Sequence, residues 1–378
     1  MEKLMAERLR FHRENPEPDL ATYKRCKRIV LGKSLATKSL VYLDTNFWVY
    51  LCEVALGRAK KKEHEEMSKR LYALVAQGLI VCPFSYAQFM EIMRQSDDRT
   101  RLQTAKIMDD LSLSICIQNP WEVAIMEVEQ LFQEQKPHHS QFPKIRERVW
   151  TKATDFHGEM TVIPAAEGIA PSERLAVAKT VDDLNWSISL SELVDFIGKD
   201  QERWQTTSDF SSGLNQEKEA FASENQSFEE HYKKQLAGII AGHENQIYEA
   251  AVAVQNEDLG ADSSPPDAAI MHQIKSLIYT GLVTKKFQLK LPTLHIQASL
   301  HAAFRADKGR KYKPNDWQDF YHAVTALPYF DFLLTERSLK HVLTTPPLCL
   351  DALYGTQVLC GEEEILACEF AKPTKAAS

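Results

Sequence analysis

Hydrophobic residues recur at two spacings along the chain, and the first third of the sequence alternates between them. Short apolar runs, or strict apolar–polar alternation, predict buried strands. The segments between them have apolar residues at the spacing of a helix face. Strands that alternate with helices are typical of a parallel sheet covered by helices on both faces, so we predict an α/β fold. The predicted strands are 40–43, 79–83 and 112–117, and the predicted helices begin at Phe47, Ser85 and Arg99.

The middle of the chain has a different pattern. From about 131 to 291 strand signals are few, and long polar segments at 186–204, 215–241 and 267–281 have helical periodicity. The α/β pattern returns at Pro292 with two helices and a strand at 330–335, and a further edge strand is predicted at 356–360. We therefore divide the chain into an N-terminal helical arm (1–38), a first part of the α/β core (39–130), a helical insertion (131–291), a second part of the core (292–370) and a disordered tail (371–378).

Composition narrows the class of protein. The 45 basic and 52 acidic residues give a formal charge of −7, which argues against a protein that coats nucleic acid but leaves room for a local basic patch. Apolar runs stay well short of the ~20 residues that span a bilayer, and the charged N-terminus does not resemble a secretory signal. The 7 cysteines are scattered without a Cys-x-x-Cys pair. We expect free thiols, a cytoplasmic location and no membrane partner.

Carboxylates follow the predicted strands at several places. Asp44 comes directly after the first strand, and Glu91 lies in the helix after the second. Asp316 and Asp319, three residues apart, project from one face of a later helix, and Glu336 follows the strand that ends at 335. In an open α/β sheet, ligands bind in the crevice beyond the carboxyl ends of the strands, so we predict that these side chains gather there.

Such a cluster points to a cation. Carboxylates brought together at neutral pH repel one another unless a cation neutralises them, and Mg²⁺ or Mn²⁺ prefers an all-oxygen site. An ion held in this way can activate water and orient a phosphodiester. The sequence has no Gly-x-Ser-x-Gly elbow and no glycine-rich phosphate loop after a strand. For Asp44 and Asp316 a role as helix N-cap stays open beside the metal role.

Three stretches resemble the PIN-domain nucleases. Residues 41–46 resemble the family's opening motif, 85–91 its second motif, and 319–326 followed by 332–335 its third acidic helix and last strand. The resemblance implies a three-layer α/β/α fold and a Mg²⁺- or Mn²⁺-dependent nuclease, acting more often on RNA than on DNA. It implies Asp44, Glu91 and Asp319 as metal ligands.

The sequence also departs from the family. Many members carry Asp or Asn two residues after the threonine of the last strand, where this chain has Arg337. Whether Glu336 or Asp316 provides a fourth acidic group therefore stays open, and so does a catalytically inactive PIN-like scaffold that binds partners. The insertion is foreign to compact members of the family. A toxin or defence effector controlled by a regulatory protein, and a homodimer, are further hypotheses.

Several neighbouring residues would support the site. A basic loop precedes the acidic helix and would hold a phosphate backbone, with an ordinary solvated loop as the alternative. His322, one turn after Asp319, is either part of the site or a helix histidine with a structural hydrogen bond. Thr45, Asn46 and Thr335 would orient ligands or water, and the basic residues of the loop are Lys308, Arg310, Lys311 and Lys313.

Overall fold

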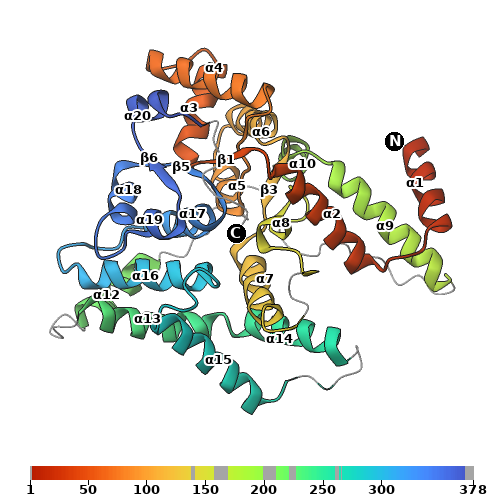
Figure 1. Cartoon of the computed structure of the whole chain (residues 1–378). Coiled ribbons are helices and arrows are strands. Elements are labelled where there is room, and N and C mark those ends of the chain that lie inside the picture. Colours follow the sequence, from red (N-terminus) through yellow and green to blue (C-terminus); the bar gives the residue numbers. More distant parts are fainter. Residues whose placement is uncertain are drawn as a thin grey trace.

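A computed structural model describes residues 2–137, 141–156, 169–198, 210–220, 227–259, 264 and 266–370 (Figure 1). The protein is a mixed α/β structure in which helices predominate. In chain order the strands are β1 (Ser39–Leu43), β2 (Ile80–Val81), β3 (Ile115–Ile117), β4 (Trp150–Lys152), β5 (Phe332–Leu334) and β6 (Gln357–Leu359). The helices are α1 (Glu2–Glu14), α2 (Leu20–Leu35), α3 (Thr45–Ala55), α4 (Lys62–Ala76), α5 (Tyr86–Met93), α6 (Asp98–Ser112), α7 (Pro120–Gln133), α8 (Ile145–Arg148), α9 (Pro171–Ser187), α10 (Leu190–Ile197), α12 (Phe210–Ala220), α13 (Phe228–Gly242), α14 (Glu244–Leu259), α15 (Ala268–Val283), α16 (Pro292–Ala306), α17 (Asp316–Tyr329), α18 (Arg337–Thr344), α19 (Leu350–Tyr354) and α20 (Glu362–Ala367).

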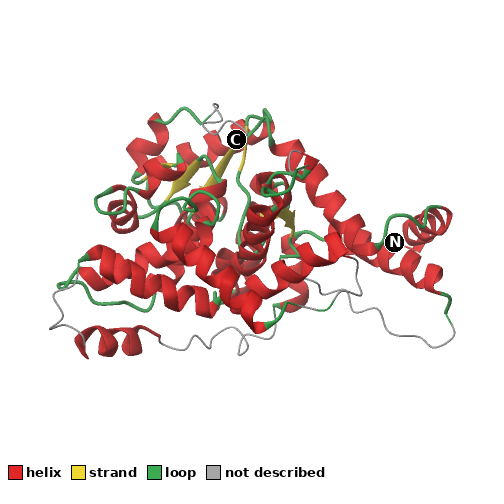
Figure 2. Ribbon diagram, turned by 60° about the horizontal axis from the view of Figure 1, so that its bottom comes forward, coloured by secondary structure: helices red, strands yellow, loops and turns green. Residues whose placement is uncertain are grey.

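A four-stranded parallel sheet lies at the centre, in the order β2-β1-β5-β6 (Figure 2). Successive residues of β1 face opposite sides: Val41 and Leu43 belong to one apolar cluster, and Leu40 and Tyr42 to another. Both faces are therefore buried, as expected for a parallel sheet. Helices α3 to α6 pack on the first face, and α16 to α19 on the second. The predicted parallel sheet with helices on both sides is confirmed, and the PIN-like topology stays a prediction.

The predicted elements around the sheet form for local reasons. Asp44 caps α3 at the point where β1 ends. Ser85 caps α5 through a capping box, because its hydroxyl accepts from the backbone of Gln88 while the Gln88 side chain accepts from the Ser85 N–H. Both helices therefore start immediately beyond the carboxyl ends of the strands. The edge strand predicted at 356–360 is β6.

The third predicted strand differs from expectation in its pairing. β3 pairs antiparallel with β4 in a separate two-stranded sheet, and a single parallel bridge between Phe84 and Cys116 links it to the chain after β2. β4 lies inside the region for which we predicted helices. Its short apolar segment, with Trp150 almost fully buried, gives too little periodicity to stand out in the sequence.

The insertion contributes its own apolar core. Helices α13, α14 and α15 pack with α7 and α16 around buried side chains such as Leu236, Ile247 and Ile278. Within the segment 186–204, for which we predicted helical structure, α9 ends at Ser187 and α10 is a separate helix capped by Ser189. The end of that segment and the tail 371–378 lie outside the described residues.

One buried carboxylate joins three helices of this core. Glu127 of α7 accepts hydrogen bonds from the Thr293 backbone N–H (3.0 Å to Oε2), the Thr293 hydroxyl (2.6 Å) and the Tyr329 hydroxyl (2.8 Å). Its side chain thereby fixes the first turn of α16 and the last turn of α17 against α7. This contact sets the position of α17, which carries the acidic residues discussed below.

The N-terminal arm packs on α8, α9 and β4 through α1 and α2. A buried ionic cluster, the arm cluster, holds it there. Asp183 of α9 accepts from Tyr23 (2.8 Å) and pairs with three basic side chains, and Asp182 pairs with Lys27 (2.7 Å) and lies 3.8 Å from the Lys24 ammonium. The Asp183 pairs are with Arg8 (2.7 Å), His12 (3.0 Å) and Lys27 (3.0 Å).

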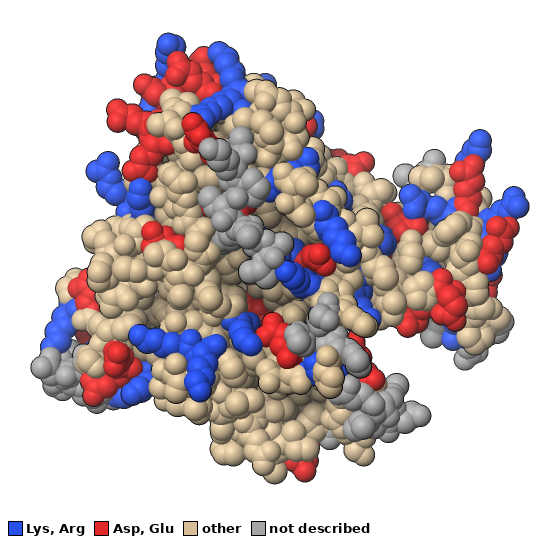
Figure 3. Space-filling model, viewed as in Figure 1, with Lys and Arg blue, Asp and Glu red and all other residues tan. Residues whose placement is uncertain are grey.

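Charge on the molecular surface is mixed. Figure 3 shows Lys and Arg side chains interspersed with Asp and Glu on the N-terminal helices at the right, and both signs elsewhere on the same face. Within the described residues, no helix is both long and apolar enough to cross a membrane.

Candidate acidic active site

The first of the candidate acidic residues, Asp44, lies at the carboxyl end of the central strand. Its side chain is 5% exposed. One carboxylate oxygen accepts from the Thr45 backbone N–H (2.6 Å), and the other accepts from the Thr335 hydroxyl (2.7 Å). Thr335 follows β5, the neighbouring strand. Asp44 therefore acts as the predicted helix cap, and it also stands at the junction of two strands, where the predicted site lies.

Glu91 of α5 reaches the same place from the helix that follows β2. Its Oε2 atom accepts a hydrogen bond from the Thr45 hydroxyl and lies 3.0 Å from His322 Nε2. The same ring nitrogen lies 3.6 Å from an Asp44 oxygen. His322, which the sequence left undecided between two roles, therefore lies between the two carboxylates.

The His322 ring is held from behind by a buried tyrosine. Tyr42 Oη lies 2.6 Å from His322 Nδ1 and 2.7 Å from Ser85 Oγ. With both ring nitrogens protonated, Nδ1–H donates to Tyr42 and Nε2–H donates to Glu91. Nearby, the Gln88 side-chain amide donates to the Leu43 carbonyl and ties α5 to the end of β1. Tyr42 and Gln88 do not stand out in the sequence as site residues, and a tyrosine within an apolar strand is typical of a buried core.

Charge and burial shift the pKa values of this group in linked ways. Burial alone would lower the pKa of His322, but Tyr42, Glu91 and Asp44 raise it well above its ordinary value. Burial alone would raise the pKa of Glu91, but the positive charge and hydrogen bond of His322 and the hydrogen bond of Thr45 bring it below its ordinary value. The two shifts favour a His322 imidazolium paired with a Glu91 carboxylate.

Asp319 is placed differently from the other carboxylates. It lies on the same helix as His322, three residues earlier, and among the described residues its side chain makes no hydrogen bond or ion pair. Burial, together with the negative charges of Asp44, Asp316 and Glu336, raises its pKa to about 7, although His322 offsets part of that rise. The negative charge near Asp319 thus exceeds the positive charge available to it.

Glu336 lies on the exposed rim of the cluster. It is the N-cap residue of α18 without a capping bond of its own, and it accepts from the side-chain amide of Asn46. Asn46 lies two residues after Asp44. The structure therefore places His322 against Asp44 and Glu91, with Asp319 and Glu336 close enough for their charges to interact, and we name these five residues the acidic cluster. Arg337, the residue that departs from the family pattern, begins α18 and is exposed.

Asp316 makes its hydrogen bonds to the basic loop. Its oxygens accept from the Lys313 backbone N–H (2.7 Å) and from the Arg310 guanidinium (3.4 Å). Asn315 rather than Asp316 is the N-cap residue of α17. Asp316 thus orders the loop that precedes its own helix, and of the two candidates for a fourth acidic group, Glu336 has the closer ties to Asp44.

The basic loop is held by a helix of the insertion. Lys218 of α12 donates to the carbonyl oxygens of Phe304 (2.7 Å) and Arg310, and the Asn215 amide bonds the backbone of Tyr312 in both directions (2.8 and 2.9 Å). Arg310 stacks on the Phe304 ring, with 3.6 Å between the guanidinium carbon and the ring centroid. Of the four predicted phosphate contacts, Lys311 lies 3.7 Å from Glu219, and Lys308 and Lys313 are exposed.

No family model, curated protein or solved structure matches this chain. The chemistry of the acidic cluster therefore has to be argued from its own geometry. Within the described part of the chain, no group of three or more His, Cys, Asp or Glu side chains is arranged so that it could hold a metal ion. In the acidic cluster the His322 ring lies between Asp44 and Glu91, and Asp319 interacts with both His322 and Asp44 through its charge.

The donor chemistry of this group nevertheless fits a hard divalent cation. Carboxylate oxygens are the ligands that Mg²⁺ and Mn²⁺ prefer. The His322 imidazolium lies between Asp44 and Glu91, where positive charge is most favourable. A cation would have to share Glu91 with His322 and would gain the carboxylate of Asp319.

Proposed function

We propose that this protein is a Mg²⁺- or Mn²⁺-dependent endonuclease that hydrolyses phosphodiester bonds, with RNA as its preferred substrate. The observation that supports the proposal is that Asp44, Glu91 and Asp319 lie near one another beyond the carboxyl ends of a parallel sheet, where His322 contacts the first two and the pKa of Asp319 is raised by negative charge. Surplus negative charge at a strand-end crevice favours cation binding.

Each residue has a role that follows from its surroundings. Asp44, Glu91 and Asp319 would hold the cation, which supplies an activated water and a positive charge on the phosphate. Thr335 and the Thr45 backbone fix the two oxygens of Asp44, so its orientation does not depend on the cation. The raised pKa of Asp319, about 7, means that this carboxyl can carry a proton near neutral pH before a cation arrives.

Glu336 and the basic loop would act on the substrate side. Glu336 lies on the exposed rim, held by Asn46, where it can order solvent beside the cluster. The ammonium groups of Lys308 and Lys313 are exposed on the loop before α17, and they would contact the phosphate backbone. Since α12 fixes the shape of this loop, the insertion takes part in substrate binding.

A second candidate function has its own support. The contact between His322 and Glu91 already neutralises one carboxylate, as it would in a PIN-like scaffold that has lost its metal and binds partners. Arg337 at the position where many PIN-domain proteins carry Asp or Asn agrees with this alternative. A defence effector or toxin, regulated by a partner protein, is compatible with either function.

The test is cleavage of single-stranded RNA and DNA in Mn²⁺, Mg²⁺ or EDTA. We expect RNA cleavage that requires the metal and falls more than about a hundredfold in Asp44→Asn, because a catalytic cation supplies several kcal/mol of transition-state stabilisation. Glu363→Gln, an exposed carboxylate on α20, is the matched control and should cut like wild type.

The controls separate three outcomes. Equal cleavage by wild type and Asp44→Asn identifies a contaminating nuclease. If the wild type cuts neither substrate but binds Mn²⁺ in calorimetry, the protein has a metal site and is not a nuclease. Inert wild type that binds no Mn²⁺ overturns the nuclease and favours the scaffold.

A further inference from the structure

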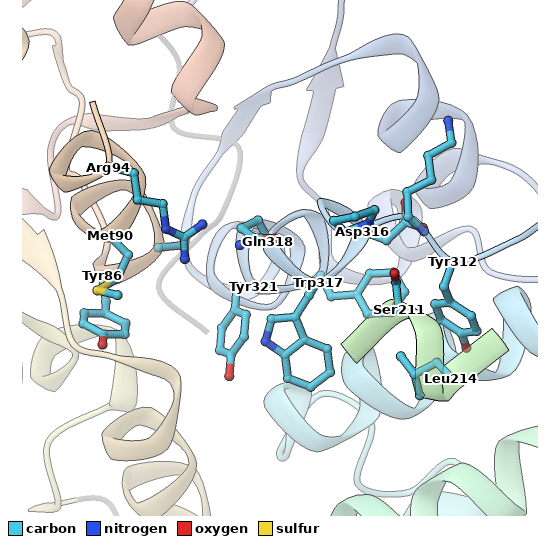
Figure 4. A pocket seen from close by; sticks show the side chains of 14 residues that line it. Tyr86, Met90, Arg94, Ser211, Leu214, Tyr312, Asp316, Trp317, Gln318 and Tyr321 are labelled. Atoms are coloured by element: carbon cyan, nitrogen blue, oxygen red, sulfur yellow. The ribbon is translucent and has the colours of Figure 1, made fainter. Parts of the chain in front are cut away.

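A pocket of about 220 Å³ lies beside the acidic cluster, between α5, α17 and α12 (Figure 4). Two of its walls come from the same helices that carry Glu91 and Asp319. The third wall comes from the insertion, through Ser211 and Leu214. The pocket therefore opens where the core, the basic loop and the insertion meet, and of its lining residues the roles proposed above use only Lys313.

Aromatic side chains form much of its lining. Trp317 and Tyr321, four residues apart, extend from the same side of α17, with ring centroids 5.5 Å apart in an edge-to-face arrangement. Tyr86 lines the opposite wall from α5. Trp317 is 36% exposed, although an indole of this size is highly buried on average. Flat apolar faces are thus presented to whatever enters the pocket.

Two cationic side chains also line the pocket. Arg94, at the C-terminus of α5, donates to the Gln318 carbonyl oxygen at 2.9 Å in the amide orientation that also lets Gln318 donate to Pro314. Its Nε atom is buried and has no hydrogen-bond partner among the described residues. Lys313 of the basic loop lines the other side. Arg94 follows Glu91 by three residues, so the residues that line the pocket and those of the acidic cluster are neighbours in sequence on α5.

Aromatic faces flanked by cations are what an unpaired nucleotide requires. Bases stack on aromatic rings whatever their identity, and Arg and Lys contact the phosphates on either side. The pocket is smaller than the roughly 300–1,000 Å³ typical of sites for drug-sized ligands, so it suits one ring system rather than a base pair. A base held within a duplex cannot enter such a pocket unless it is unstacked.

We propose that this pocket binds one unpaired nucleobase of a single-stranded substrate, at a nucleotide that flanks the one cleaved. The inference rests on the proposed nuclease function and adds to it a preference for single strands. Trp317, Tyr321 and Tyr86 stack on the base, and Arg94 and Lys313 hold the adjacent phosphates. The single-stranded nucleic acid then runs from the basic loop past the pocket towards Asp319.

The test measures binding separately from cleavage. Affinity of the full chain for a short fluorescein-labelled single-stranded RNA of mixed sequence is measured by fluorescence anisotropy in EDTA, which prevents metal-dependent cutting. We expect Trp317→Ala to weaken binding about tenfold, as stacking contacts do, and Trp317→Phe to retain most of the affinity. Tyr248→Ala removes an aromatic residue of similar exposure, 38%, from α14 outside the pocket, and it should bind like wild type.

Abasic substrates identify the contact more directly. A single abasic nucleotide, placed at successive positions of the RNA, should weaken wild-type binding most at one position. Trp317→Ala should not be weakened further at that position, because the missing base and the missing indole remove the same contact. Salt dependence gives a second criterion. Lys313→Ala should reduce the slope of log affinity against log salt, whereas Trp317→Ala should leave the slope unchanged. On duplex RNA, Trp317→Ala and wild type should bind alike.

The outcomes keep this proposal distinct from the nuclease itself. Unchanged binding of single strands by Trp317→Ala overturns the base pocket, even if wild type cuts RNA. Binding that depends on Trp317, without cleavage in any metal, supports the pocket and overturns the nuclease. Wild type that binds no single-stranded RNA or DNA overturns both.

Discussion

Two groups of buried carboxylates in this protein differ in how their charge is balanced. In the arm cluster, Asp182 and Asp183 face basic side chains from both N-terminal helices, including Arg8, Lys24 and Lys27. In the acidic cluster, His322 lies between Asp44 and Glu91, and the charges of Asp44 and Glu336 also act on Asp319. In the arm cluster the basic side chains outnumber the carboxylates, whereas in the acidic cluster the carboxylates outnumber the basic side chains.

The pKa values record the same difference. Burial alone would raise the pKa of Asp183, but hydrogen bonds from His12, Tyr23 and Lys27 and the charge of Lys27 lower it to about 2. For Asp319, burial and neighbouring carboxylates act in the same direction and raise the pKa to about 7. A balanced ionic group explains how an arm is held in place. A group with unbalanced charge indicates a site for something that the chain does not itself provide.

The largest expected effect comes from breaking the balanced group. Asp183→Ala should lower the free energy of unfolding by about 3–5 kcal/mol, because it leaves several buried basic groups without their partner. Glu173→Ala is the matched control on the same helix: its partner Arg13 is half-exposed, and the loss should stay below about 1 kcal/mol. Chemical denaturation measures both. Equal losses would show that the arm cluster is no more important than a surface pair.

The next effect concerns His322, the histidine that contacts Asp44 and Glu91 in the acidic cluster. His322→Gln should destabilise the protein by about 2 kcal/mol, since Glu91 and Asp44 lose a buried partner. The site becomes more negative, so added Mn²⁺ should raise the melting temperature of His322→Gln more than that of wild type. His341→Gln, at an exposed histidine of α18, should leave both quantities unchanged. An identical Mn²⁺ response in wild type and His322→Gln would contradict a metal role for this cluster.

Glu127 extends the comparison to a buried carboxylate whose partners among the described residues are the uncharged side chains of Thr293 and Tyr329 and the Thr293 backbone. Burial raises its pKa to about 8, although hydrogen bonds from Thr293 and Tyr329 oppose the rise. A group with a raised pKa in the folded state stabilises the protein fully below its unfolded pKa, and the stabilisation is lost as pH rises. We therefore expect stability to fall from about pH 4.5 to about pH 8, by at most about 1.4 kcal/mol per pH unit. Denaturation across this range should show a smaller slope in Glu127→Gln, and an unchanged slope would assign the pH dependence to other groups.

The smallest effect has the opposite sign. Asp319→Asn removes one of several mutually repelling carboxylates, so in EDTA we expect the free energy of unfolding to rise by up to about 1 kcal/mol. The same substitution should abolish metal-dependent cleavage, which would show that the repulsion is retained for function. Denaturation and RNA cleavage are measured on one preparation. A loss of stability would mean that Asp319 has a structural partner.

Much of the core could be predicted because its signals are local. The apolar run that ends at Asp44, the Ser85 cap and the strand before Glu336 each reveal themselves within about ten residues. The antiparallel pairing of β3 with β4 could not be predicted in this way, since register depends on contacts between distant segments. For His322 the spacing of three residues from Asp319 was the available signal. Its contact with Glu91, 231 residues away in sequence, required the fold.

The hydrogen bonds between α12 and the basic loop have a practical consequence for the design of shortened variants of this protein. A helical region inserted between two halves of a core is an obvious target for deletion, to obtain a smaller catalytic unit. Here such a deletion would remove Lys218 and Asn215, which fix the carbonyl groups of the loop, and β4, the partner of β3. The minimal working unit therefore includes at least part of the insertion, and truncation should be designed around α12 rather than through it.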